Sequence, residues 1–233
     1  MFYDEMERER DLNKTVENLE RNGMRAVVVD TREEAARYVE DTIPAGASVA
    51  VGGSVTLKEC GIIDLLKSGK YNFFTPRPTV APDGTATVSP EAAVANYRAA
   101  YGADYYLSGS NAITREGELY NVDGRGNRVS AIAYGPQKVI IIAGINKIVK
   151  NLDAAVARVK TVAAPQNCRR LGIESYCAEM DKCHSFFRGG DKAANMTDGC
   201  LSNTRICCHY LVSSKQSADG RITVVLVKEK LGY

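Results

Sequence analysis

The sequence has little net charge and no long apolar run, and each absence removes a class of function. Its 30 Lys and Arg residues face 28 Asp and Glu residues, a formal net charge of +2. We therefore expect neither a nucleic-acid nor a membrane partner, because both need basic surfaces or apolar spans. The opening residues, MFYDEMERERDLNKTVENLERNG, are too charged for a secretory signal. The chain is expected to be cytoplasmic.

Nucleotide-binding motifs are lacking as well. No G-x-x-x-x-G-K-[ST] string occurs, which argues against a P-loop nucleotidase. The run Gly124-Arg125-Gly126 begins like a dinucleotide motif, but Val129 stands where the third glycine is needed. We also expect this loop to lead into a strand, whereas the dinucleotide motif opens a helix.

What the sequence does contain is an alternation of strands and helices in a chain of one-domain size, 233 residues with 45% hydrophobic content. RAVVV and SVAV are each followed by a helical pattern, and YNFFT and DYYLSGS are further strands. QKVIIIAG is a buried strand feeding a helix, INKIVKNLDAAVARVK, that we expect Pro165 to end. The alternation predicts an α/β fold, an open and mostly parallel sheet with helices on both faces.

Two antiparallel hairpins are expected beside this sheet. ELYNV and RVSAI flank a turn-rich stretch, DGRGN, and should pair with each other. The last residues form two β-rich runs around Ser217–Gly220, which we interpret as a second hairpin. We place an α/β domain at residues 1–165, and at residues 166–233 a Cys-rich segment and C-terminal hairpin packing on the same domain.

The loop after SVAV is a candidate anion site. Gly52-Gly53-Ser54 ends a strand and starts a helix, where free backbone N–H groups favour a phosphate or a carboxylate. A plain strand-to-helix turn is the alternative, because Gly-Gly-Ser also suits such turns.

Two stretches together resemble a known family. GGSVTL after a strand, and SGSNAITREGELYNVDGRGNRVSAIAYGPQKVIIIAGINKIV, look like the LUD domain of lactate-utilisation proteins, over residues 1–165. The resemblance implies a Rossmann-like fold of the NagB/RpiA/CoA-transferase-like group, with its site at the carboxyl ends of the strands. It also implies an accessory or redox-linked subunit in the oxidation of L-lactate to pyruvate, beside iron–sulfur oxidoreductase subunits. Oligomerisation is left open.

The resemblance also gathers residues of three loops into one crevice for a small anionic ligand. We expect the loops 52–56, 108–114 and 117–128 to meet at one sheet edge. Glu118 is the candidate nucleophile, since a Glu attacks the thioester in CoA-transferases of this fold; a solvated hairpin carboxylate is the alternative. Arg125 offers a bidentate fork to an anion, or is simply an exposed loop residue. The predicted ligand-binding residues are Gly52, Gly53, Ser54, Thr56, Asn111, Asp123, Arg125 and Asn127.

Six of the seven cysteines lie between Cys168 and Cys208. In a reducing compartment such a cluster favours a metal or redox site over structural disulfides. LUD proteins similar to this one end in a pattern like P-C-x5-C-x2-C-x6-C, whose outer spacings match two pairs here, with residues 184–199 as an insertion. The resemblance predicts four thiolate ligands for zinc or an iron–sulfur cluster: Cys177, Cys183, Cys200 and Cys207.

Three functions therefore stand open. The favoured one is the LUD-type accessory subunit that binds a small anion. The second is a stand-alone enzyme of the CoA-transferase-like fold, acting on an acyl-CoA or a phosphorylated sugar. The third is a sensing module whose cysteines form a thiol redox switch.

Overall fold

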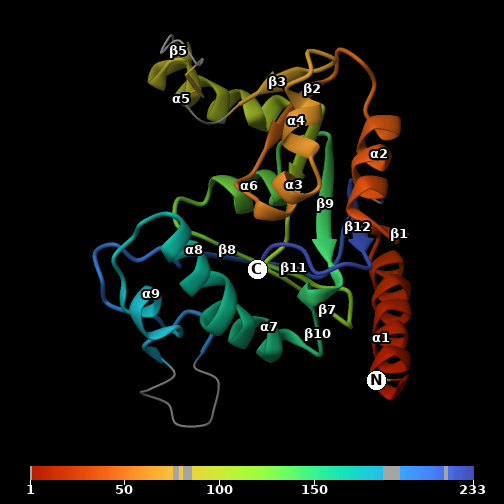
Figure 1. Ribbon diagram of the computed structural model, residues 1–233, viewed down its shortest axis with the longest axis vertical. Helices are drawn as coiled ribbons and strands as arrows, with labels where there is room; N and C mark the ends of the chain where they lie inside the picture. The colour runs from red at the N-terminus through yellow and green to blue at the C-terminus, as the bar shows by residue number, and fades with distance from the viewer. Residues whose placement is uncertain (1, 76–78, 81–85, 186–194, 218–219) are drawn as a thin grey trace.

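A six-stranded parallel sheet forms the centre of the computed structural model, which describes all residues except 1, 76–78, 81–85, 186–194 and 218–219 (Figure 1). The strand order is β1-β12-β9-β6-β2-β3, and every neighbouring pair is parallel, so the carboxyl ends of the strands share one edge. The strands are β1 (Arg25–Val29), β2 (Ser48–Val51), β3 (Asn72–Phe74), β6 (Tyr105–Ser108), β9 (Lys138–Gly144) and β12 (Ile222–Val227).

Helices cover both faces of this sheet. Ile141 of β9 packs in a core with α1 and α6, while its neighbours Ile140 and Ile142 pack in a second core with α2, α3 and α4. Burial on both faces explains why β9 is an unbroken apolar run, with no polar alternation. The predicted fold class is confirmed. The helices are α1 (Phe2–Arg21), α2 (Arg32–Thr42), α3 (Val55–Glu59), α4 (Ile62–Leu66) and α6 (Asn127–Ala133).

A second, four-stranded sheet lies below the first in Figure 1, in the order β10-β7-β8-β11. Its strands are β7 (Ala112–Thr114), β8 (Leu119–Asp123), β10 (Ile148–Val149) and β11 (His209–Ser213). Helix α7 packs against it through a small core around Tyr120. The remaining elements are β4 (Thr79–Val80), β5 (Ala86–Val88), α5 (Pro90–Ala99), η1 (Ala100–Gly102), η2 (Ile145–Lys147), α7 (Leu152–Arg158), the π-helix η3 (Val159–Ala163), α8 (Ala164–Arg170) and α9 (Tyr176–Met180).

The segment RVSAI is a helix, and its prediction as a hairpin strand is wrong. Gly126 adopts a left-handed conformation with φ of 79° and turns the chain into α6. The Asp123 carboxylate then accepts hydrogen bonds from the backbone N–H groups of Arg128 and Val129, at 2.8 and 2.9 Å. A side chain from the preceding strand thus satisfies donors that a helix start leaves unpaired. The partners of β8 are β7 and β11, both antiparallel.

The helix expected after β9 is broken into several elements. Ile148–Val149 leaves the helical path to pair with β7. Asn151 then starts α7, its side chain accepting from the Ala154 N–H at 3.0 Å. Pro165 lies at the start of α8 directly after the π-helix η3, inside a continuous helical stretch, and does not end a helix as predicted.

The expected C-terminal hairpin is also wrong. Strand β11 pairs with β8 in the second sheet, whereas β12 enters the main sheet between β1 and β9. Part of the predicted turn, residues 218–219, lies outside the described residues. In the part of the chain that the structure describes, no helix is both long and apolar enough to cross a membrane.

After β12 the chain returns along the end of β9 and fixes the last residues near the sheet edge. A Cβ added to Gly144 would stand 2.5 Å from the Glu229 carbonyl oxygen and 2.6 Å from the Leu231 nitrogen. The Leu231 N–H donates to the Asn146 side chain at 3.0 Å. A side chain at Gly144 would therefore push this tail off the strand.

We expect Gly144→Ala to lower the free energy of unfolding by about 1–3 kcal/mol, since the added methyl group would overlap backbone atoms of the tail. Gly102→Ala is the matched control, because nothing lies within 4 Å of its Cβ position. Urea denaturation of both variants measures the difference. Equal stabilities would mean that the tail does not pack on Gly144.

Candidate functional site

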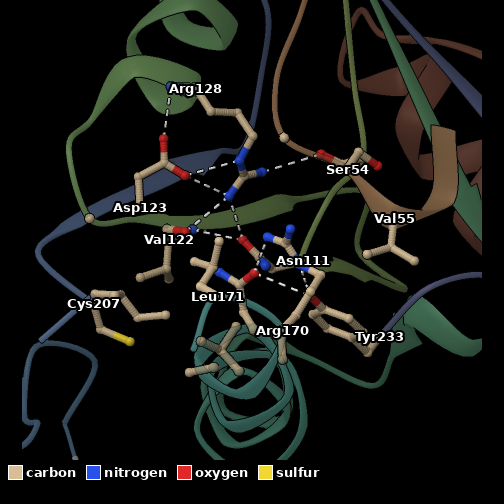
Figure 2. A pocket seen from close by; sticks show the side chains of 18 of the residues that line it. Ser54, Val55, Asn111, Val122, Asp123, Arg128, Arg170, Leu171, Cys207 and Tyr233 are labelled. Atoms are coloured by element: carbon tan, nitrogen blue, oxygen red, sulfur yellow. Dashed lines mark hydrogen bonds and ion pairs between the residues drawn. The ribbon is translucent and has the colours of Figure 1, made fainter. Parts of the chain in front are cut away.

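A pocket of about 450 Å³ opens at the shared edge where four parallel strands of the main sheet end (Figure 2). Ser54 follows β2, Asn111 follows β6, Lys147 follows β9 and Tyr233 follows β12, and all four line it. Helix α8 forms the opposite wall through residues that include Arg170. Open parallel sheets bind their ligands at this edge, and the volume lies in the range of small-molecule sites.

Six of the eight predicted ligand-binding residues line this pocket: Gly53, Ser54, Asn111, Asp123, Arg125 and Asn127. The other two lie behind its wall. A Cβ on Gly52 would stand 2.9 Å from the Arg128 side chain, so glycine allows this arginine to pack against the loop. The buried Thr56 hydroxyl accepts a hydrogen bond from Lys147.

Glu118 is not brought into the pocket. It lies in the turn between β7 and β8, at the opposite end of β8 from Asp123, and its carboxylate accepts a 2.9 Å hydrogen bond from the Thr114 hydroxyl. The neighbouring Gly117 packs on the backbone of Asn18 in α1. Of the loop 117–128, only residues from Val122 onward line the pocket, together with the loops after β2 and β6.

Arg128, which the sequence pattern did not single out, organises the pocket floor. Its guanidinium donates to Asp123 at 2.9 Å, to the side chain of Asn111 at 2.7 Å and to the Gly109 carbonyl at 3.2 Å. It also donates to the fully buried Asn121. Arg128 is only 8% exposed, so its charge is compensated by the carboxylate and by these acceptors.

The wall formed by α8 presents a second arginine. The Arg170 guanidinium donates to the Tyr233 hydroxyl and to the Asn167 side chain, both at 2.6 Å. The Tyr233 hydroxyl also donates to Asn167, at 3.1 Å. Figure 2 shows Arg170 and Tyr233 together beside Asn111. Arg170 and Arg125 are exposed, and neither forms an ion pair with a described carboxylate.

Lys147 is the most perturbed cation of the pocket. It is 5% exposed, and its amine donates to the Thr56 hydroxyl at 3.2 Å. Burial, together with the positive charges of Arg158 and Arg128, lowers the pKa of Lys147 to about 7. Its position immediately after the apolar run of β9 was the available sequence signal, because strand carboxyl ends carry the site in this fold.

The cysteine-rich segment forms a separate small cavity. All four predicted metal ligands line it, namely Cys177, Cys183, Cys200 and Cys207, together with the unpredicted Cys168 from α8. Cys60 and Cys208 do not line it. The cavity volume is about 20 Å³, enough for roughly one water molecule. Within the described residues, no three His, Cys, Asp or Glu side chains are placed to hold a metal ion.

The thiols of this cavity differ in pKa. The Cys177 thiol donates to the Cys168 sulfur at 3.8 Å, a hydrogen bond that lowers the pKa of Cys168 to about 7 and raises the pKa of Cys177. Burial raises the pKa of Cys207 to about 12. Cys183 accepts from the Ser185 hydroxyl at 3.3 Å. His184 stacks edge-on against Tyr176, with ring centroids 4.9 Å apart.

The fold and the pocket define a Rossmann-like α/β protein with a cationic site at the ends of its parallel strands. A model of the LUD domain matches residues 12–227, so the chain belongs to the LUD-domain family. It is at this level a lactate-utilisation-related protein. No curated protein matches the chain in sequence.

Solved structures with similar folds include a DUF162 family protein from Deinococcus radiodurans, 14% identical, with a TM-score of 0.48 over 94% of this chain and 97% of that one. Ribose 5-phosphate isomerase from Plasmodium falciparum is 19% identical, with a TM-score of 0.31 over 52% of each chain. The eIF2B beta protein from Chaetomium thermophilum is 14% identical, with a TM-score of 0.34 over 52% of this chain and 43% of that one.

The depressed pKa of Lys147 predicts a pH-dependent stability. The folded protein holds this amine neutral above about pH 7, whereas an unfolded chain keeps a lysine protonated up to about pH 10.4, so unfolding takes up a proton and stability rises with pH in between. In urea denaturation between about pH 7.5 and 9.5, we expect Lys147→Met to remove a rise of about 1.4 kcal/mol per pH unit. The exposed Lys150→Met is the control. If the free energy of unfolding changes with pH in the same way for wild type and Lys147→Met, the pKa of Lys147 is not depressed as proposed.

Proposed function

We propose that the pocket at the strand ends binds a small organic anion of lactate utilisation through a carboxylate. The observation that carries this proposal is the charge of the lining. Three arginines line the pocket, whereas among the described residues the only side-chain carboxylate in the lining is that of Asp123, which Arg128 already neutralises. A negatively charged ligand would offset the positive charge of the other arginines.

Two groups are suited to meet that ligand directly. Arg170 and Arg125 lie at the exposed side of the pocket, where a planar guanidinium can form two parallel hydrogen bonds to one carboxylate. Tyr233 and Asn167 hold Arg170 in place, which reduces the entropy lost on binding. By contrast, the Arg128 guanidinium already donates to acceptors of the protein and forms the floor of the pocket.

For the chain as a whole, we propose the role of an accessory or redox-linked subunit that works beside iron–sulfur oxidoreductase subunits. The support is membership of the LUD-domain family together with a pocket suited to an organic anion. A CoA-transferase-like reaction through Glu118 gains no support, because that carboxylate lies away from the pocket.

Replacing Arg170 or Arg125 by Gln should weaken the binding of L-lactate or pyruvate about tenfold each, since each change removes a charge-assisted hydrogen bond worth about 1.4 kcal/mol in a partly exposed site. Isothermal titration calorimetry measures the dissociation constants. Arg37→Gln, on the exposed side of α2, serves as the control for a change of net charge. If neither acid binds the wild-type protein, or if all three variants bind alike, the proposed ligand site is wrong.

We propose further that the cysteine cavity takes up one metal ion of the size of zinc. The supporting observation is that five thiols from separate segments line one cavity about as large as a single water molecule, which is too small for a four-iron cluster. Thiolates are the soft ligands that zinc accepts. Because no three ligands converge as the described residues stand, the thiol side chains have to rotate toward the ion.

Protein purified without oxygen should therefore contain about one zinc per chain by elemental analysis. Cys183→Ser and Cys200→Ser should each release it, whereas Cys208→Ser should not, because Cys208 lies outside the cavity. Binding should weaken as the pH falls, since thiols with a raised pKa must lose protons to bind. Several iron atoms with sulfide would indicate a cluster instead, and a metal-free protein would make the cavity a packing feature.

A further inference from the structure

The buried amine of Lys147 forms no ion pair with a described carboxylate that would stabilise the fold. In the described part of the chain, its only hydrogen bond goes to the Thr56 hydroxyl, and no carboxylate lies within ion-pair distance of it. A lysine that is 5% exposed and unpaired is costly to keep, so its presence in the pocket wall calls for a chemical reason.

The surroundings of this amine keep it nucleophilic. Arg158 and Arg128 are the cations that act on it, while Glu59 and Cys60 are the groups that act in the opposite direction. Arg158 is itself fixed, donating to the Asn111 carbonyl at 2.6 Å and to the Asn146 carbonyl at 3.2 Å. Desolvation beside other cations is the usual way to obtain a neutral lysine near neutral pH. A neutral amine has the lone pair that an ammonium lacks.

The pocket that Lys147 lines also contains two arginines suited to bind an anion. Arg170 and Arg125 are placed to hold a carboxylate, and Lys147 lines the same pocket from the end of β9. A small acid with a carbonyl group beside its carboxylate would bring that carbonyl into the pocket that Lys147 lines. Oxidation of a 2-hydroxy acid produces such a 2-oxo acid.

We propose that the Lys147 amine forms an imine with the carbonyl carbon of a small 2-oxo acid bound in this pocket, an inference that rests on the proposed anion site. The Nζ lone pair attacks the carbonyl carbon, and the C=O π pair moves onto oxygen, which takes up a proton as nitrogen gives one up. The resulting hydroxyl takes a proton from solvent and leaves as water while the nitrogen lone pair forms the C=N bond, and the iminium nitrogen returns a proton to solvent to give the imine. No electrons are gained or lost, and no co-reactant is consumed. The Thr56 hydroxyl, which accepts one N–H of the amine, is a positioning group for it.

Trapping with borohydride tests the imine on the full-length protein. Pyruvate is added with sodium cyanoborohydride, and intact mass spectrometry followed by peptide mapping locates the reduced adduct. We expect a single adduct on Lys147, formed about a thousandfold faster at pH 7 than on an ordinary exposed lysine, since about half of the Lys147 amines are neutral there. The labelling rate should level off above about pH 8, whereas that of ordinary lysines rises tenfold per pH unit.

Two variants and one competing ligand show whether the adduct forms on Lys147 in the pocket. Lys147→Gln should abolish the adduct, while Lys150→Gln, a change of an exposed lysine three residues further on, should leave it intact. L-Lactate, which has no carbonyl to attack, should suppress labelling by occupying the pocket. If calorimetry shows that pyruvate binds but no adduct forms on Lys147, the imine is refuted and the anion site stands. If pyruvate does not bind at all, both proposals fail.

Discussion

The ion pair between Asp123 and Arg128 is the interaction on which the geometry of the site depends. Its two partners are five residues apart, yet they join the end of β8 to the start of α6 and, through Arg128, to the loops after β2 and β6. Both side chains are almost fully buried, so removing one partner would leave an uncompensated charge, a loss of about 3–5 kcal/mol. The same pair closes the pocket floor, while Arg125 and Arg170, the exposed arginines of the lining, form no ion pair with a described carboxylate.

The main sheet could be predicted from the sequence because each of its strands and helices is indicated by a pattern within its own segment. The β-branched runs RAVVV and KVIIIAG indicate strands, although RAVVV lies at the sheet edge with Val28 exposed and only KVIIIAG is buried. The helical repeat of TREEAARYVEDT gives α2 with Thr31 as its N-cap. Parallel topology then follows from the alternation of strand and helix, and with it the edge where ligands bind. The loop after β2 could be placed at this edge for that reason, whereas Asn111 was placed there by the resemblance to LUD domains.

The predictions were wrong where a partner outside the segment overrides the segment's own conformational preference. RVSAI has β-branched residues and follows a Gly-rich turn, but the Asp123 carboxylate captures the N–H groups of a helix start. Ile148 and Val149 fit a helical stripe equally well, yet they pair with β7. Lys147, Arg170 and Tyr233 come from segments that meet only in the folded chain, so no spacing in the sequence marks them as one site. The cysteines were found because composition, rather than geometry, revealed them.

The position of β12 has a consequence for how the protein is made. This strand separates β1 from β9 in the sheet, although it follows both of them in the chain by a long interval. While a ribosome is still producing the middle of the chain, β1 has no neighbour on either side and β9 has an open edge. Closing the sheet therefore requires contacts between residues nearly 200 positions apart, such as Val27 with Val225. Such an order of synthesis leaves two apolar strand edges exposed until late, a condition that favours the help of a chaperone during translation.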